Sequence, residues 1–223
     1  MKKRNGSSGR QNEIYSWVES AIYEAELLPG DVIDEQILCR KFDVSRTPVR
    51  EALLQLASRN LISFVPRKGA IVTKLSVKEI VPMWEVLTGL EVMACELAAR
   101  RMKSEERSAL ETLHLDSEKY TKTDDIEGYF VANRQFHKLI HEGSRNTYLV
   151  GEIRNLRLRL RSYGRRPYQR VGGLKVSFNA HSAILQAILE GNVDAAGWAM
   201  QDHVSGGFSL LDFLADAANQ AHE

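Results

Sequence analysis

Residues 44–53 read VSRTPVREAL, and this stretch decides how the N-terminal third of the chain folds. Ser45 or Thr47 can cap a helix here, because an N-cap side-chain oxygen accepts a hydrogen bond from an otherwise unpaired backbone N–H. Pro48 suits the first helical turn, where its missing N–H costs little. Apolar residues then recur at helical spacing, namely Val49, Leu53 and Leu56. The pattern predicts a helix that ends near residue 60.

Two further helices are predicted upstream of this stretch. Residues 11–27 carry apolar side chains at helical spacing, and Pro29-Gly30-Asp31 ends that helix. Asp34 can cap a second, short helix that runs through Phe42. Residues 1–10 hold four positive charges and no acid, and we expect them to form a disordered basic arm.

Two short β-type runs follow downstream, at residues 61–65 and 70–73, with a turn between them that carries Arg67 and Lys68. Residues 11–75 therefore read as three helices and a β-hairpin, the pattern of a winged helix-turn-helix.

In this motif the third helix enters the major groove of DNA and the hairpin, or wing, lies over the backbone or in the minor groove. Arginine is the commonest bidentate reader of guanine, and serine and threonine hydroxyls contact bases or phosphates. The predicted DNA-binding residues are Ser45, Arg46, Thr47, Arg50, Arg67, Lys68 and Gly69. The alternative is a small α+β domain whose arginines form a solvated surface.

Charge is unevenly distributed along the chain. The 30 Lys and Arg nearly balance the 29 Asp and Glu, which gives a net charge of +1. Residues 1–75, however, carry 12 basic against 9 acidic side chains, so the N-terminal part is the basic one. This asymmetry is typical of a nucleic-acid-binding module joined to another domain.

Secreted and membrane classes do not fit. The basic start has no apolar core after it, and the most apolar window, residues 80–99, contains three glutamates. Two cysteines are too few for a disulfide framework and suit a reducing compartment. We therefore expect a cytoplasmic protein with no membrane partner.

Residues 76–223 are predicted to form a second, all-helical domain. Six amphipathic segments follow one another, separated by capping residues, glycines and prolines, and Pro82 is expected to restart or kink the first of them. The predicted fold class is mainly α: a winged helix-turn-helix followed by an all-α antiparallel helical bundle.

Three histidines on separate predicted helices, His137, His181 and His203, raise the possibility of a metal site. Asn133 lies four residues before His137 and therefore on the same helix face. Three imidazoles and one oxygen suit zinc first, with nickel, manganese and iron as alternatives. Spacing alone does not bring three helices together, so ordinary buried or surface histidines remain the alternative.

A fourth histidine, His141, and a group of arginines lie near these residues in the sequence. His137 and His141 have the spacing of a zinc protease motif, but Lys138 stands where that motif needs a glutamate; we expect His141 to face outward at its helix end. A helix face also carries Arg154, Arg157, Arg161 and Arg165, which is either an anion pocket or a solvated face.

The motifs closely resemble those of the GntR family of bacterial transcription regulators. The resemblance rests on residues 28–34 (LPGDVID), 44–53, 61–62 and 66–72 (PRKGAIV). The helical remainder is similar to the ligand-binding domain of the FadR subfamily, called FCD. Its marks here are Leu90-Glu91, residues 97–99, 133–137 (NRQFH), 144–146, 181–184 (HSAI), 187–188 and 200–203 (MQDH).

The resemblance implies a divalent metal held by Asn133, His137, His181 and His203, next to a small carboxylate effector. Asn133 replaces the commoner aspartate and removes a negative charge from the site. Leu87 stands where many relatives have an arginine, so another cation is expected to bind the effector's carboxylate. The candidates are Arg134, Arg154 and Arg161. Gln36 likewise replaces a DNA-contacting arginine of several relatives.

The resemblance also implies a homodimer on a near-palindromic operator. The function expected from the sequence is a DNA-binding regulator, either a repressor or an activator, whose operator affinity is controlled by a small organic acid bound near the metal. The alternatives are a purely structural metal, a metal-free dimerisation domain, and a helical metallohydrolase. The chain is not expected to be an enzyme, because no motif position supplies a general base.

Overall fold

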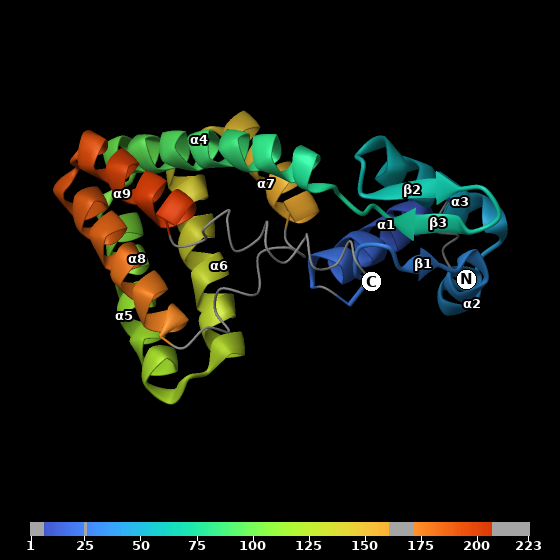
Figure 1. Cartoon of the computed structure of the whole chain (residues 1–223), viewed down its shortest axis with the longest axis horizontal. Coiled ribbons are helices and arrows are strands. Elements are labelled where there is room, and N and C mark those ends of the chain that lie inside the picture. Colours follow the sequence, from blue (N-terminus) through green and yellow to red (C-terminus); the bar gives the residue numbers. More distant parts are fainter. Residues whose placement is uncertain (1–6, 25, 161–171, 207–223) are drawn as a thin grey trace, which may run out of the picture. The chain divides into compact units, whose positions relative to one another are not determined.

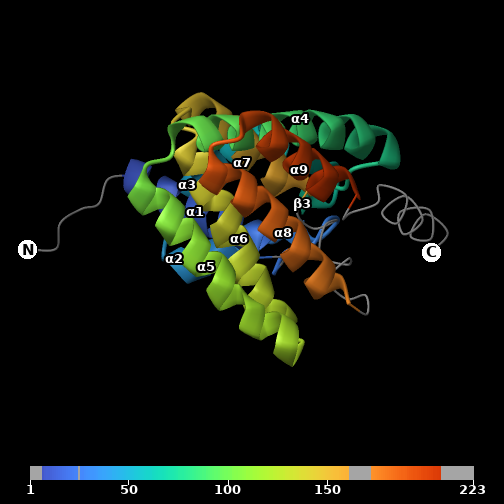
Figure 2. The ribbon, with the colours of Figure 1, turned by 90° about the vertical axis from the view of Figure 1, so that its left-hand side faces the viewer.

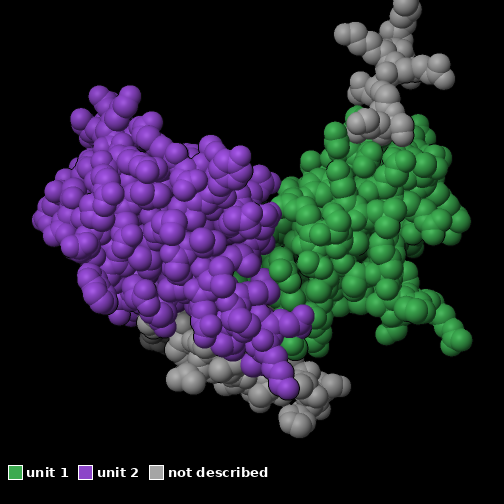
Figure 3. All heavy atoms as spheres, turned by 90° about the horizontal axis from the view of Figure 1, so that it is seen from above, with its two compact units in different colours: residues 1–76, 158–162 green, residues 77–157, 163–223 purple. Residues whose placement is uncertain are grey.

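The computed structural model describes residues 7–24, 26–160 and 172–206. The chain divides into two compact units, which Figure 3 distinguishes by colour. The first contains residues 1–76 and 158–162, and the second contains residues 77–157 and 163–223.

The first unit is a winged helix-turn-helix, as the sequence predicts. Its elements are α1 (Ser7–Tyr23), β1 (Val32–Ile33), α2 (Glu35–Phe42), α3 (Arg46–Ser58), β2 (Ile62–Val65) and β3 (Gly69–Val72). The predicted hairpin is part of a three-stranded antiparallel sheet of order β1-β3-β2. The added strand, β1, pairs Val32 with Ile71 and Ile33 with Ala70.

Capping residues mark where α2 and α3 begin. The Asp34 carboxylate accepts hydrogen bonds from the backbone N–H groups of Gln36, at 2.6 Å, and Ile37, at 3.2 Å, which confirms the predicted N-cap of α2. Ser45 is the N-cap residue of α3, although its side chain makes no capping hydrogen bond. The inward faces of α1, α2 and α3 share one core. It includes Ile14, Val18, Leu38, Val49, Leu53 and Leu56.

The second unit is an all-helical bundle, which confirms the predicted fold class. Its described helices are α4 (Val77–Arg101), α5 (Ser104–Thr123), α6 (Ile126–Gly143), α7 (Thr147–Leu160), α8 (Gly173–Glu190) and α9 (Val193–Gly206). The end of α7, from Leu158 onward, belongs to the first unit. α4 packs against α6, α8 and α9, while α5 packs against α6 and α8 (Figures 1 and 2). Their shared core is aliphatic with one buried aromatic. It includes Cys95, Phe136, Ile140, Ile184, Ile188 and Met200.

Two expectations about the N-terminal arm and Pro82 need correction. Residues 7–10 are the first turn of α1 rather than part of an arm, and an ion pair between Arg10 and Glu13 at 2.8 Å supports that turn; residues 1–6 lie outside the described residues. Pro82 neither ends nor restarts α4, which is a single helix of 25 residues with the proline inside it.

Within the described ranges, every helix is either too short or too polar to cross a lipid bilayer. Cys39 and Cys95 are both free thiols, as expected.

Candidate metal centre and nucleic-acid interface

The residues predicted to contact DNA lie at the start of α3 and at the tip of the wing. Ser45, Arg46, Thr47 and Arg50 are all exposed, because the buried side of α3 is taken by Pro48, Val49, Ala52, Leu53 and Leu56. The Arg50 side chain is 70% exposed, and its Nε lies 3.9 Å from the Glu35 carboxylate, too far for a hydrogen bond. The cationic start of α3 is thus open to solvent.

The wing is a tight turn that exposes two cations. Arg67, Lys68 and Gly69 are exposed, and the Lys68 N–H donates to the Val65 carbonyl at 3.1 Å. The two residues between Val65 and Lys68 are Pro66 and Arg67. Because the second of them has a positive φ, the four residues form a type II turn. The φ angle of Arg67 is +67° and that of Gly69 is +83°. Arg67 holds a backbone conformation that usually requires glycine or asparagine.

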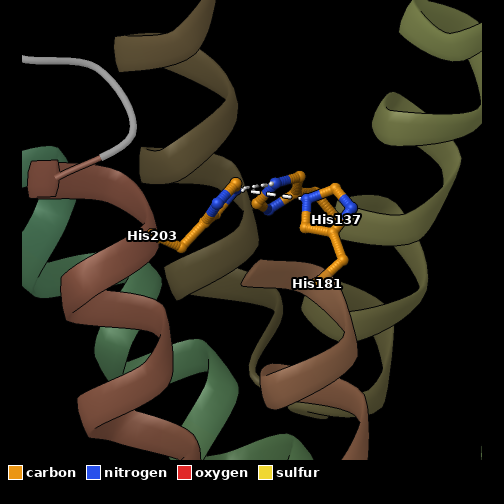
Figure 4. Close-up of side chains that lie close together, drawn as sticks. All are labelled: His137, His181 and His203. Atoms are coloured by element: carbon orange, nitrogen blue, oxygen red, sulfur yellow. Dashed lines mark hydrogen bonds between the residues drawn. The ribbon is translucent and has the colours of Figure 1, made fainter. Parts of the chain in front are cut away.

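The three predicted histidine ligands converge from three helices. His137 comes from α6, His181 from α8 and His203 from α9, and all three are buried (Figure 4). The Nε2 atom of His203 lies 3.2 Å from the Nε2 atom of His137 and 3.2 Å from that of His181. The bundle therefore achieves the convergence that sequence spacing alone left open.

These residues fit a divalent metal on two observations. Two nitrogens bound to one ion at about 2.0–2.1 Å lie about 2.9–3.4 Å apart in octahedral or tetrahedral geometry, and the observed separations fall in that range. The fourth predicted ligand, Asn133, is buried one turn before His137, and its Oδ1 has no hydrogen-bond partner. An unsatisfied buried oxygen one helical turn from a predicted histidine ligand has the donor chemistry that a metal ion would satisfy.

Burial keeps the three imidazoles neutral. It lowers the pKa of His137 to about 4 and that of His203 to about 3, and it holds the pKa of His181 well below its usual range. The neighbouring histidines and the positive charge of Arg157 act in the same direction. A neutral imidazole offers the lone pair that binding to a metal requires.

Aromatic rings line the histidine cluster. Phe136 stacks on His181 with ring centroids 4.3 Å apart, and Tyr129 lies parallel to the same imidazole at 6.4 Å. His114, for which no partner was predicted, contacts the Ser182 hydroxyl at 2.9 Å and stacks on Phe178. The contacts of Phe136 and Tyr129 restrict the orientation of the His181 ring.

A second buried polar group lies next to the histidine cluster. Glu91 of α4 is fully buried, and its carboxylate accepts from Arg157 Nε at 2.5 Å and lies 2.7 Å from His141 Nε2. The same carboxylate lies 3.7 Å from His137 Nδ1. The expectation that His141 faces outward is therefore wrong: Glu91 provides a buried partner for it.

Sequence reasoning did not select Glu91 or Arg157 as site residues, although signals for both exist. Glu91 is a charged residue on the otherwise apolar inner face of α4, and such a residue needs a partner. Arg157 belongs to the predicted arginine face of α7, from which the effector candidates were drawn. Glu91, His137 and His141 also form a second group whose ligand atoms lie within 4.8 Å of one another.

The structure describes two of the three effector-binding candidates. Arg134 is half-buried, with its guanidinium 5.6 Å from the centre of the Phe130 ring, and Arg154 is exposed on α7. Arg161 lies outside the described residues. The structure instead turns Arg157 toward the buried centre.

Comparison with known proteins matches both units. The model of the gntR family of bacterial regulatory proteins matches residues 10–72, and the FCD domain model matches residues 82–206. The chain is 31% identical over 139 residues to YdhC, an uncharacterized HTH-type transcriptional regulator of Bacillus subtilis, over 61% of this chain and 62% of YdhC.

Two Escherichia coli proteins extend the similarity over most of the chain. The HTH-type transcriptional repressor RspR is 23% identical over 192 residues, which cover 86% of this chain and 84% of RspR. The solved structure of McbR/YncC superposes with a TM-score of 0.77 at 20% identity and covers 95% of this chain and 98% of that one. The structural match shows the shared fold.

Proposed function

Because the chain belongs to the GntR family of bacterial transcriptional regulators and carries an FCD domain, we propose that it is a metabolite-controlled DNA-binding protein. In this proposal the winged helix binds an operator, and the helical unit holds a divalent metal and a small organic acid. The acid controls the affinity for the operator. Like its named relatives, the chain is a transcriptional regulator and not an enzyme.

The observation that carries the proposal is the convergence of three neutral, buried imidazoles, together with the unpaired Asn133 oxygen one helical turn before His137. His137, His181, His203 and Asn133 would hold the ion. When bound, a divalent cation supplies coordination positions that a carboxylate ligand can complete. With no carboxylate among its four ligands, the centre would retain the positive charge of the ion, which favours an anionic ligand. Zinc is the first candidate because it suits a site rich in imidazole.

The DNA-binding part of the proposal rests on the seven exposed residues of α3 and the wing. Arg46 and Arg50 would read base edges in the major groove, and Ser45 and Thr47 would contact bases or phosphates. Arg67 and Lys68 would lie along the backbone or in the minor groove, where Gly69 permits close approach of the main chain. The site of action is then the bacterial cytoplasm, where the operator is located.

The coupling between the units is proposed to be a population shift. α4 begins at Val77, directly after the wing, and carries Glu91 into the buried centre. A ligand that favours one arrangement of the chain shifts the operator-binding equilibrium by its difference in affinity for the two arrangements. A coupling of about 1–3 kcal/mol would change operator affinity about 5–150-fold. RspR is named a repressor, and we extend that sign of regulation to this chain.

Homodimerisation is part of the same proposal. The face of α4 opposite its buried residues exposes Val86 and Met93 with Gly89 between them. An apolar strip along a helix is a typical subunit contact, and a two-fold dimer would match an operator with two half-sites.

Two of the alternatives, a structural metal and a metallohydrolase, make different predictions. A structural metal would stabilise the fold, and organic acids would not change operator affinity. A metallohydrolase needs a base to activate water, and Glu91 is poorly suited because Arg157 and His141 already bind its carboxylate.

The first experiment is metal analysis of the purified protein together with thermal-shift screening against small carboxylic acids. We expect about one divalent metal per chain, its loss in His181→Ala, and at least one acid that raises the melting temperature and changes operator affinity. A protein that stays metal-free when metal is resupplied, and that no acid stabilises, would refute the proposed sensor. An acid-independent but metal-stabilised protein would support the structural alternative.

A further inference from the structure

The Glu91 cluster, defined as Glu91, His141 and Arg157, has the composition of a second metal site, but its contacts indicate another role. Glu91 and His141 share a ligand-like geometry with His137. Arg157, however, donates its Nε–H to the Glu91 carboxylate at 2.5 Å. A permanently charged guanidinium at this position already neutralises the carboxylate and would repel a second cation.

The position of Glu91 relative to His137 is that of a group which orients a metal ligand. His137 directs Nε2 toward the histidine cluster and Nδ1 toward Glu91, whose Oε2 lies 3.7 Å away. A movement of about 0.5–1 Å would bring this pair into hydrogen-bonding distance. A histidine that donates Nδ1–H to a carboxylate has its Nε2 lone pair available for the metal, and such partners orient the ring and raise its basicity.

Glu91 in turn is held from two helices. His141 of α6 lies one turn beyond His137, and Arg157 reaches the carboxylate from α7 with 31% of its side chain exposed. Removing either partner would leave a fully buried carboxylate short of compensation. The Glu91 carboxylate is thus fixed next to His137, although His137 lies 46 residues after Glu91 in the sequence.

We propose that Glu91, held in place by Arg157 and His141, is the positioning residue that fixes the tautomer and orientation of His137 for metal binding. This inference rests on the proposed metal centre and adds a function for α4 and α7 within it. Asn133 contributes no negative charge to the site. Glu91 supplies one from outside the ligand set, because its carboxylate acts on the ion through the imidazole of His137.

The test is to measure Zn²⁺ affinity by competition with a chelator, and the visible spectrum of the Co²⁺-substituted protein, in matched variants of the full chain. Glu91→Gln and Arg157→Met are expected to weaken Zn²⁺ binding about 10–100-fold and to alter the Co²⁺ absorption bands. Glu91→Asp retains the charge and should recover part of the affinity. Glu85→Gln, an exposed site on the same helix, is the control and should bind like the wild type.

Two measurements separate positioning from folding. The melting temperature of each metal-free variant shows whether it is folded, and only folded variants are compared. In the wild type, ¹⁵N NMR of the histidine side chains should show His137 protonated at Nδ1 and bound to Zn²⁺ through Nε2. This measurement needs no variant.

The outcomes distinguish this inference from the proposed function. Failure of the wild type to bind Zn²⁺ would reject the metal centre itself. Zn²⁺ binding by the wild type that Glu91→Gln leaves unchanged, or an Nδ1 that is not protonated at His137, would overturn only the role of Glu91.

Discussion

Arg67 at the tip of the wing adopts a strained backbone conformation, with φ at +67° and no glycine to accommodate it. Such strain costs of order 1–3 kcal/mol and concentrates at functional positions. We predict that Arg67→Gly leaves the free energy of unfolding unchanged or raises it by about 0–1 kcal/mol, because relief of strain is partly offset by chain entropy. Operator affinity should fall. The negative slope of the logarithm of the operator-binding constant against the logarithm of the salt concentration should become shallower by about 0.9.

Denaturant unfolding and fluorescence anisotropy with an operator fragment measure the two effects. Arg67→Ala is the control, because it removes the cation and keeps the strained conformation. Operator affinity that does not change in Arg67→Gly at low salt would show that the wing tip makes no phosphate contact.

Arg46 is the first residue of α3 and is exposed at the helix end that the motif directs into the major groove. We predict that Arg46→Ala reduces the free energy of operator binding by about 1–3 kcal/mol and relaxes sequence preference at one base position. Arg46→Lys keeps the charge but not the bidentate geometry, so it should recover affinity and not preference. A uniform loss over all sequences, in a binding-site selection assay, would make Arg46 a phosphate contact.

Sequence analysis placed a residue correctly when its partner is close in the chain, and misplaced a residue whose partner is distant in the chain. Asp34 caps the helix that begins next to it, because a capping bond spans two or three residues. His141 was misplaced because its partner, Glu91, lies on another helix. Helical spacing reports which residues share a face of one helix, and it contains no information about the opposite helix.

At the scale of elements, Arg107 of α5 joins the ends of two other helices. Its guanidinium donates to the carbonyls of Ile188, Leu189 and Ala99, the last two at 2.9 and 2.6 Å. These carbonyls belong to the last turns of α8 and α4, which lack partners within their own helices and carry the negative end of the helix dipole. Arg107 thus ties α5 to both helices that flank it at this end of the bundle.

We predict that Arg107→Met lowers the free energy of unfolding of the helical unit by about 2–4 kcal/mol, because several carbonyls lose a charged donor together. Denaturant unfolding followed by circular dichroism measures the change. Arg100→Met, an exposed arginine on α4, is the matched control and should change it by less than about 0.5 kcal/mol. Equal effects of the two substitutions would show that the Arg107 contacts add nothing specific.

The elements themselves were predictable to the extent that each has a local signal. Helix periodicity and flanking caps predicted the six helices of the bundle, and Gly191 ends α8 in the left-handed conformation. β1 was missed because a strand of two residues shows no alternation, and only its pairing with β3 defines it. The expected restart at Pro82 does not occur, because α4 continues past the proline as one helix despite the backbone hydrogen bond that the proline removes.

At the scale of the whole molecule, the histidine cluster required a tertiary arrangement that no single helix specifies. The residue types and the resemblance to GntR regulators identified His137, His181 and His203, and the packing of α6, α8 and α9 against α4 brings their Nε2 atoms together. The chain also passes between its two units at the peptide bond from Arg157 to Leu158. The residue that holds Glu91 is therefore covalently joined to a segment of the first unit.

Assembly of two chains should depend on the exposed face of α4. We predict that Met93→Glu converts the dimer to a monomer, because a charge on an apolar contact surface must lose its hydration to be buried. Light scattering after size-exclusion chromatography measures the mass, and operator affinity should fall with it. Val176→Glu places the same charge on an exposed apolar position of α8 and should leave the dimer intact. A dimer that persists in Met93→Glu would place the interface elsewhere.

Signal and binding should be separable in the whole protein, because the proposed metal ligands belong to the second unit and the residues predicted to contact DNA belong to the first. We predict that His137→Ala abolishes metal binding and the response of operator affinity to an organic acid, while specific operator binding without ligand changes less than about 3-fold, a free-energy change below about 0.7 kcal/mol. The measurement is operator binding by anisotropy with and without metal and acid. His114→Ala, another buried histidine, should retain the response. If His137→Ala instead lowers the melting temperature and operator affinity together, and acids have no effect on the wild type, the metal is a structural component and another signal controls the DNA-binding unit.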